Sequence, residues 1–180
     1  MSHSLTDNYI QLLDSFSLSL KENGITIGNS ITDVEIKKFE VNNKLNLPID
    51  LKYFLLSING FADDEMYAMS RFWRLDEYIS VSSYFSANVI KDTIPDSDLS
   101  SHRKFVDING NWLLPGIDSF YLFGDYNVNG SYWATQLVPN NPIKTTIICI
   151  SDFSNIYRVV ANSFTEFIDT FFNQCPEELL

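Results

Sequence analysis

The sequence holds few of the residues on which most catalytic and metal-binding sites depend. Its 180 residues include only two histidines, two cysteines and seven glycines. Neither His3 nor His102 has a second histidine or cysteine at the spacing of a zinc site. The glycines form no phosphate-cradling G-x-G-x-x-G or Walker pattern. We therefore predict that the protein is not an enzyme and that it binds no metal and no cofactor.

Long apolar segments are missing as well. No apolar run approaches the roughly 20 residues that span a bilayer, and residues 1–7 lack the basic and apolar regions of a signal peptide. We therefore expect a cytoplasmic protein that has no membrane partner. The sequence leaves a disulfide between Cys149 and Cys175 open, but thiols usually remain reduced in the cytosol.

Basic residues are scarce relative to acidic ones. The chain carries 12 Lys and Arg against 23 Asp and Glu, which gives a net charge of −11. Nucleic-acid phosphates would be repelled by such a surface, so we expect no nucleic-acid partner. A partner protein with a basic surface would instead be attracted, and its rate of encounter would rise. The alternative is that the charge serves only to keep the chain soluble.

Aromatic side chains are abundant and indicate a well-filled core. They make up 14% of the chain, with 14 Phe and 9 Tyr, and hydrophobic residues as a whole make up 45%. A chain of this length holds one such core, so we predict a single domain over residues 1–180. Phe and Tyr in this number also leave some rings for a recognition surface.

Helices are predicted at both ends of the chain. Apolar residues recur at helical spacing between residues 5 and 20, and Thr32 with Glu35 forms a capping box for a second helix. A third helix follows Pro48 and ends at Asn59-Gly60. Another capping box, Ser163 with Glu166, begins the closing helix.

Short β-strands are predicted between these helices. Candidate strands cover residues 66–69 and 71–75, and Asp76 is placed to cap a short helix over residues 77–81. Asn-Gly at 109–110 and 129–130 predicts hairpins, because both turn residues need positive φ. A further hairpin joins two runs between residues 145 and 160. The fold class is therefore α+β: N-terminal helices, an antiparallel or mixed twisted sheet of about five to six strands, and a closing C-terminal helix.

Several segments resemble one known family. Residues 47–60, LPIDLKYFLLSING, resemble the LPxDYxxFLxxxNG helix of the SUKH superfamily, which includes the Smi/Knr regulators. Residues 72–77, FWRLDE, are similar to its W-x-L-E-E step, and residues 162–168, NSFTEFI, to its closing xSFxEFL helix. Residues 120–137 resemble its central hairpin, so the likeness covers about residues 31–172 in the family's order.

The resemblance implies a function in binding rather than in catalysis. Most bacterial members are immunity proteins of polymorphic toxin systems, and each binds and neutralises a cognate toxin, often a nuclease. The fungal branch links cell-wall synthesis to signalling, so a regulatory interaction scaffold is the alternative. A toxin gene immediately upstream would favour the first function, and its absence the second.

Charge and aromatic character select a set of candidate partner-binding residues. They are Asp63, Asp64, Glu65, Trp73, Asp96, Asp98, Asp125 and Tyr132. The acids would face a basic toxin, and Trp and Tyr are common interface anchors. The alternatives are solvated acids, a Mg²⁺ or Ca²⁺ site, and aromatics that belong to the core. Tyr132 and Trp133 are adjacent on a predicted strand and should face opposite sides, one in the core and the other exposed.

Overall fold

The computed structural model confirms the α+β class. It describes residues 3–62, 65–85, 103–104, 112–126, 130–138, 145–151, 156–174 and 179, with residues 3–6 as backbone alone. The longer helices are α1 (His3–Glu22), α2 (Asp33–Asn43), α3 (Ile49–Ser57) and α5 (Phe164–Asn173). The predicted hairpin at 109–110 lies outside the described residues.

The strands form one antiparallel sheet. They are β1 (Ser70–Phe72), β2 (Ile79–Ser80), β3 (Arg103–Lys104), β4 (Phe120–Tyr126), β5 (Ser131–Gln136), β6 (Ile147–Ser151) and β7 (Ile156–Ala161). The order is β1-β4-β5-β6-β7-β3, and β2 also pairs with β4. The predicted pairings of β4 with β5 and of β6 with β7 are confirmed.

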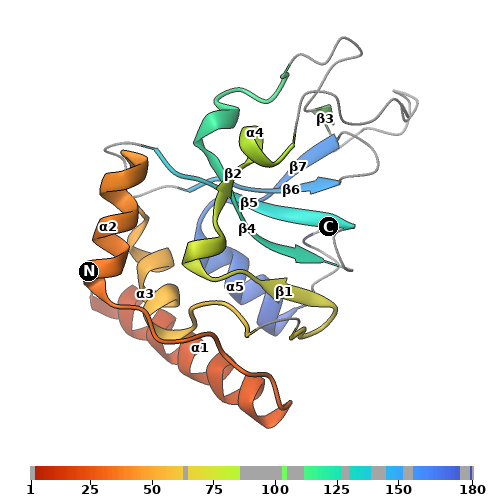
Figure 1. Ribbon diagram of the computed structural model, residues 1–180. Helices are drawn as coiled ribbons and strands as arrows, with labels where there is room; N and C mark the ends of the chain where they lie inside the picture. The colour runs from red at the N-terminus through yellow and green to blue at the C-terminus, as the bar shows by residue number, and fades with distance from the viewer. Residues whose placement is uncertain are drawn as a thin grey trace.

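The elements pack in layers. Figure 1 shows α5 behind the sheet and α1 below it, while β1 and β2 run along its β4 edge and the short helix α4 (Val81–Tyr84) lies in front. Helix α1 packs against α3 and α5. The two faces of the sheet therefore have different cover, long helices behind and short segments in front.

The helix starts follow the predicted caps with one difference. The Thr32 hydroxyl accepts a hydrogen bond from the Glu35 N–H, and the Glu35 carboxylate accepts one from the Thr32 N–H at 2.8 Å. Hydrogen bonds from Thr32 hold the pKa of Glu35 below its usual value. At α5 the Ser163 hydroxyl accepts from the Glu166 N–H at 3.0 Å. The Glu166 carboxylate, however, accepts from Asn162 instead of Ser163, so the second capping box is shifted by one residue.

The helix predicted from Asp76 is wrong. Residues Leu75–Glu77 form the 3-10 helix η1, and β2 and α4 follow it directly. The Glu77 carboxylate accepts from the Arg74 N–H at 2.7 Å, which closes the chain into a single tight turn. The Ser80 hydroxyl then caps α4 by accepting from the Ser83 N–H. Two short capped turns, η1 and α4, therefore stand where one helix over residues 77–81 was predicted.

The core lies between the back of the sheet and the helices, with Phe72 at its centre. The Phe72 ring centroid lies between 4.9 and 6.4 Å from those of Phe16, Phe54, Phe61, Phe123, Trp133, Phe167 and Phe171. Edge-to-face and offset ring pairs at this spacing add to the stabilisation from burial. The buried helical residues include Ile36, Leu51, Phe54, Leu55, Phe164, Phe167 and Ile168, while Phe39 is only half-buried.

The Phe167 side chain tests this core. It is completely buried, so Phe167→Ala should lower the free energy of unfolding by about 3–5 kcal/mol, through lost burial and the cavity left behind. Urea denaturation followed by circular dichroism measures the change. Val41→Ala, at a helix position that is 75% exposed, is the control and should stay within about 0.5 kcal/mol. A loss below about 1 kcal/mol for Phe167→Ala would contradict its place in the core.

The Cys149 thiol gives a second test, in the pH dependence of stability. Burial raises the pKa of Cys149 to about 11, with Arg158 and Ser131 acting weakly the other way. The unfolded thiol has its usual pKa of 9.0, so between these two pH values the unfolded chain binds fewer protons than the folded one. The thiol's contribution is therefore fully present below pH 9 and is lost as pH rises toward 11, by about 1.4 kcal/mol per pH unit.

Urea denaturation at pH 8, 9 and 10 measures this slope. Burial also raises the pKa of Tyr9 and of Tyr78 above the usual value of 10.0, and between pH 9 and 10 the thiol still makes the largest single contribution to the slope. Cys149→Ala should reduce the loss of stability between pH 9 and 10 by about 1 kcal/mol and leave only the part due to the tyrosines, whatever its effect on absolute stability. An unchanged slope in the variant would show that Cys149 does not cause it.

Candidate protein-binding site

The structure describes half of the predicted partner-binding residues. Asp63, Asp64, Asp96 and Asp98 lie outside the described residues, and their role stays a prediction. Glu65 is half-buried, and its carboxylate accepts a hydrogen bond from the Thr26 hydroxyl at 3.3 Å. The Glu65 carboxylate is therefore already hydrogen-bonded within the chain.

The structure brings together Trp73, Asp125 and Tyr132. The Trp73 indole N–H donates to Asp125 Oδ2 at 2.6 Å, and the Trp73 and Tyr132 rings meet edge to face at 6.2 Å. Asp125 on β4 lies directly opposite Tyr132 on β5. All three side chains are at most 7% exposed, so they form the base of a surface rather than its outer layer.

Tyr132 and Trp133 do pack against different neighbours, but the expectation that one of them is exposed is wrong. Trp133 packs behind the sheet on Phe167 and Phe171. Tyr132 contacts Trp73 and Tyr84 on the other side. Because α4 and the segment after β1 cover that second face, both rings are buried.

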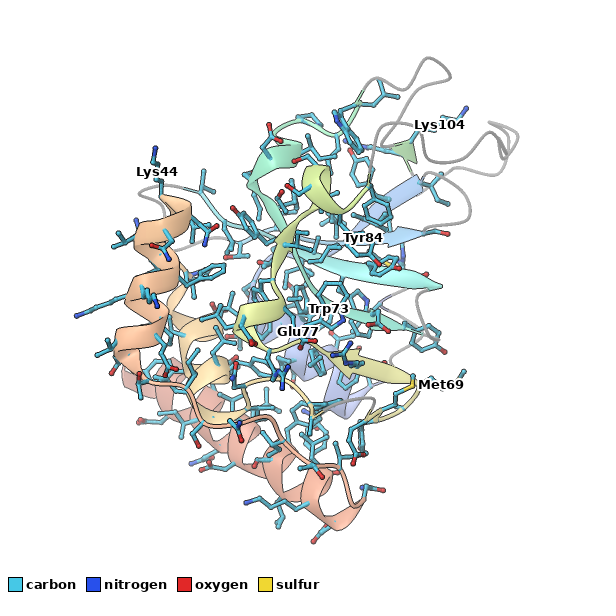
Figure 2. The ribbon with its side chains drawn as sticks, viewed as in Figure 1. Lys44, Met69, Trp73, Glu77, Tyr84 and Lys104 are labelled. Carbon is cyan, nitrogen blue, oxygen red and sulfur yellow. The ribbon has the colours of Figure 1, made fainter. Side chains whose placement is uncertain are left out.

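Tyr84 forms the exposed layer above this base, and sequence reasoning missed it. Its hydroxyl lies 2.9 Å from that of Tyr132, and its ring centroid lies 6.1 Å from that of Trp73 and 5.0 Å from that of Phe85. Figure 2 shows Tyr84 next to Trp73 at the front of the molecule. Tyr84 is 40% exposed. The sequence offers Ser80 as the cap of a short helix that ends at Tyr84, but it does not show that Tyr84 is exposed.

Ion pairs fix the chain beside Trp73. Arg71 pairs with Glu77, and Glu77 also accepts the Arg74 N–H. Figure 2 labels Trp73 and Glu77 on the segment that runs from β1 into η1. A carboxylate bonded to two neighbouring residues restrains both, so the short segment from β1 to η1 is held from either end.

A turn before β1 exposes a second large apolar side chain. Ala68 and Met69 both have positive φ, 49° and 60°, although neither is glycine. Such left-handed residues cost roughly 1–2 kcal/mol each. The turn leaves Met69 52% exposed, with its sulfur 4.0 Å from the Tyr126 hydroxyl.

A groove of about 400 Å³ opens between α2 and η1. Its lining includes Glu35 and Lys38 from α2 and Arg74 and Asp76 from the η1 side. The charges of both signs give this groove no preference for a cationic or an anionic ligand. Across the part of the chain that the structure describes, no group of three or more His, Cys, Asp or Glu is placed to hold a metal ion.

Two comparisons bear on this chain. The sequence model of the SMI1 / KNR4 family (SUKH-1) matches residues 30–170, which confirms the resemblance found over about residues 31–172. No curated protein matches the chain. Helix α1 lies before the matched residues. Among the described residues, no helix is long and apolar enough to cross a membrane.

The bond between Trp73 and Asp125 supports the site and is open to test. Asp125→Ala would leave a buried indole N–H without its acceptor, so we expect a loss of about 1–3 kcal/mol in the free energy of unfolding. Asp125→Asn keeps an acceptor oxygen for the indole N–H and should cost less than about 1 kcal/mol. Urea denaturation followed by tryptophan fluorescence measures both variants. Equal losses in the two would show that the negative charge, and not the acceptor, is what the structure needs.

Proposed function

Because the chain belongs to the SMI1 / KNR4 family (SUKH-1), we propose that it acts by binding another protein and carries out no chemistry of its own. The partner is a toxin with a basic surface, and binding neutralises it. The net charge of −11 supports a basic partner, because complementary charge speeds encounter and disfavours wrong partners.

The observation that carries this proposal is the fixed but exposed ring of Tyr84. The Tyr84 hydroxyl is hydrogen-bonded to that of Tyr132, and the Tyr84 ring packs against Trp73 and Phe85. Tyr84 is nevertheless 40% exposed. A ring held in this way loses little freedom on binding, which is one reason why Tyr is common at interface centres. Trp73, Asp125 and Tyr132 act in this proposal as the support for that ring.

Inhibition requires only that the complex cover the toxin's working surface. If the toxin is a nuclease, its substrate site is basic, because it must attract phosphates. Acidic side chains of the chain would occupy the place of those phosphates, while aromatic contacts exclude water at the centre of the interface. Glu65 and the acids outside the described residues are proposed to contribute to this attraction.

The function is tested by isolating the partner and measuring its activity. Affinity capture from the source cells, followed by mass spectrometry, identifies the protein that co-purifies. We expect a stoichiometric complex with a protein of basic surface whose toxic activity is abolished, and an association rate that falls as salt rises. A partner that binds but has no toxic activity to lose would make the chain a regulatory scaffold instead.

Tyr84 gives the sharpest variant for the purified complex. Tyr84→Ala removes the exposed anchor, so we expect dissociation at least about tenfold faster with association little changed, as is usual for interface truncations. Tyr84→Phe keeps the ring and should have a much smaller effect. Val34→Ala, at an α2 position that is 74% exposed, is the surface control. Surface plasmon resonance measures both rates, and an unchanged dissociation rate for Tyr84→Ala would exclude this face as the centre of the interface.

A further inference from the structure

A second groove, of about 680 Å³, lies between α1 and α5. From α1 it is lined by Asn8, Gln11 and Leu12, and from α5 by Glu166, Asp169 and Phe172. Residues three or four apart on a helix share one face, so each helix presents a continuous stripe to the groove. A groove of this size lies within the range of sites that bind small molecules or peptide side chains.

The charge in this groove has one sign. Glu166 and Asp169 are exposed carboxylates, and the described residues that line the groove include no Lys, Arg or His. The Glu166 carboxylate accepts from the Asn162 N–H at 2.8 Å, and that of Asp169 from the Asn173 amide at 2.7 Å. Each carboxylate offers about four lone-pair sites, so these bonds orient the oxygens and leave capacity for further donors.

The groove also has an apolar part. Leu12 and Phe172 are partly buried against the core, and the Phe172 ring lies 5.3 Å from that of Phe16. The groove therefore combines an apolar base with amides on the α1 side and carboxylates on the α5 side. A segment that fills it needs both cationic and apolar side chains.

We propose that the α1–α5 groove binds a segment of the protein partner that carries alternating basic and apolar residues. The proposal deepens the proposed function and rests on it for the identity of the partner. Glu166 and Asp169 lie three residues apart on one face of α5, with a Cβ separation of roughly 5–6 Å. Two cations spaced two residues apart along an extended strand are about 6.6 Å apart, close to this separation, and the apolar residues between them point to the opposite side of the strand, toward Leu12 on the α1 wall.

The family match covers only part of this groove. The family match begins at residue 30, and α1 ends at Glu22. The α1 side of the groove therefore lies outside the residues that the family model matches, whereas Glu166 and Asp169 lie inside them.

A synthetic peptide tests the groove without knowledge of the partner. The probe is a fluorescein-labelled 12-residue peptide of alternating lysine and leucine, and the same peptide with glutamate in place of lysine is the control. Fluorescence anisotropy with the full chain should show binding of the lysine peptide that weakens as salt rises, and no binding of the glutamate peptide. The amide resonances of Asn8, Gln11 and Asp169 should shift in ¹⁵N–¹H spectra during the titration.

Charge-matched variants separate the groove from general attraction. Glu166→Gln with Asp169→Asn removes two negative charges from the groove and should weaken binding at least about tenfold, since contacts to charged groups are the stronger hydrogen bonds. Asp33→Asn with Asp118→Asn removes the same charge at exposed positions elsewhere and should change binding less than twofold. Equal losses in the two double variants would overturn the proposal.

A second pair of variants adds charge and does not depend on removing a native contact. Ser15→Lys introduces a cation on the groove's α1 wall and should abolish binding. Val34→Lys makes the same change in net charge on α2 and should leave binding intact. If Ser15→Lys bound the lysine peptide as tightly as Val34→Lys does, the groove would not be the site.

The groove and the proposed function fail in different ways. If the Glu166→Gln, Asp169→Asn chain neutralised the toxin as well as the unaltered chain does, the groove assignment would be wrong and the toxin function would stand. If the chain neutralised no captured protein but bound the lysine peptide with the predicted variant pattern, the groove would stand and the toxin function would be wrong.

Discussion

The arrangement of helices around the sheet depends on one close approach of backbone to backbone. Gly60, just after α3, has a φ of 67°, and a Cβ on it would lie 2.5 Å from the Arg74 nitrogen. Only glycine fits there, so the end of α3 contacts the segment that follows β1 directly. The Phe61 N–H then donates to the Phe72 carbonyl, and the Trp73 N–H to that of Phe123. This glycine therefore allows the segment after α3 to hydrogen-bond to β1, and the next residue after β1 hydrogen-bonds in turn to β4.

The Asn-Gly pair was predicted as a helix terminator, but its larger role was not visible in the sequence. Asn59 accepts from the Leu75 N–H at 3.1 Å and donates to the Asn29 carbonyl at 2.9 Å, so it ties three segments together. Helix caps and hairpins depend on residues a few positions apart, which is why Thr32, Ser163 and the β4–β5 pairing were predicted well. The bonds of Asn59 span 16 and 30 residues, and no local pattern reports them.

The candidate site shows the same division between local and distant causes. Trp73, Asp125 and Tyr132 were selected for charge and aromatic character, and the structure places them in contact. Their burial could not be predicted, because it results from α4 and the segment after β1 folding over the front of the sheet. Tyr84 was missed for the same reason, since its exposure has meaning only above Tyr132, 48 positions away. The α1–α5 groove joins segments from the two ends of the described chain and left no signal in either.

The two helices that form this groove lie far apart in the sequence, and this has a consequence for folding. Helix α1 and helix α5 are separated by more than 140 residues, and closing so long a loop is entropically costly until the intervening sheet has formed. The hydrogen bonds from Thr165 to the Asp50 carboxylate, across 115 positions, depend on the same long-range closure. A chain that is still folding therefore presents no groove between these helices. Recognition through it would act as quality control, since only chains whose sheet and closing helix are complete would engage the partner.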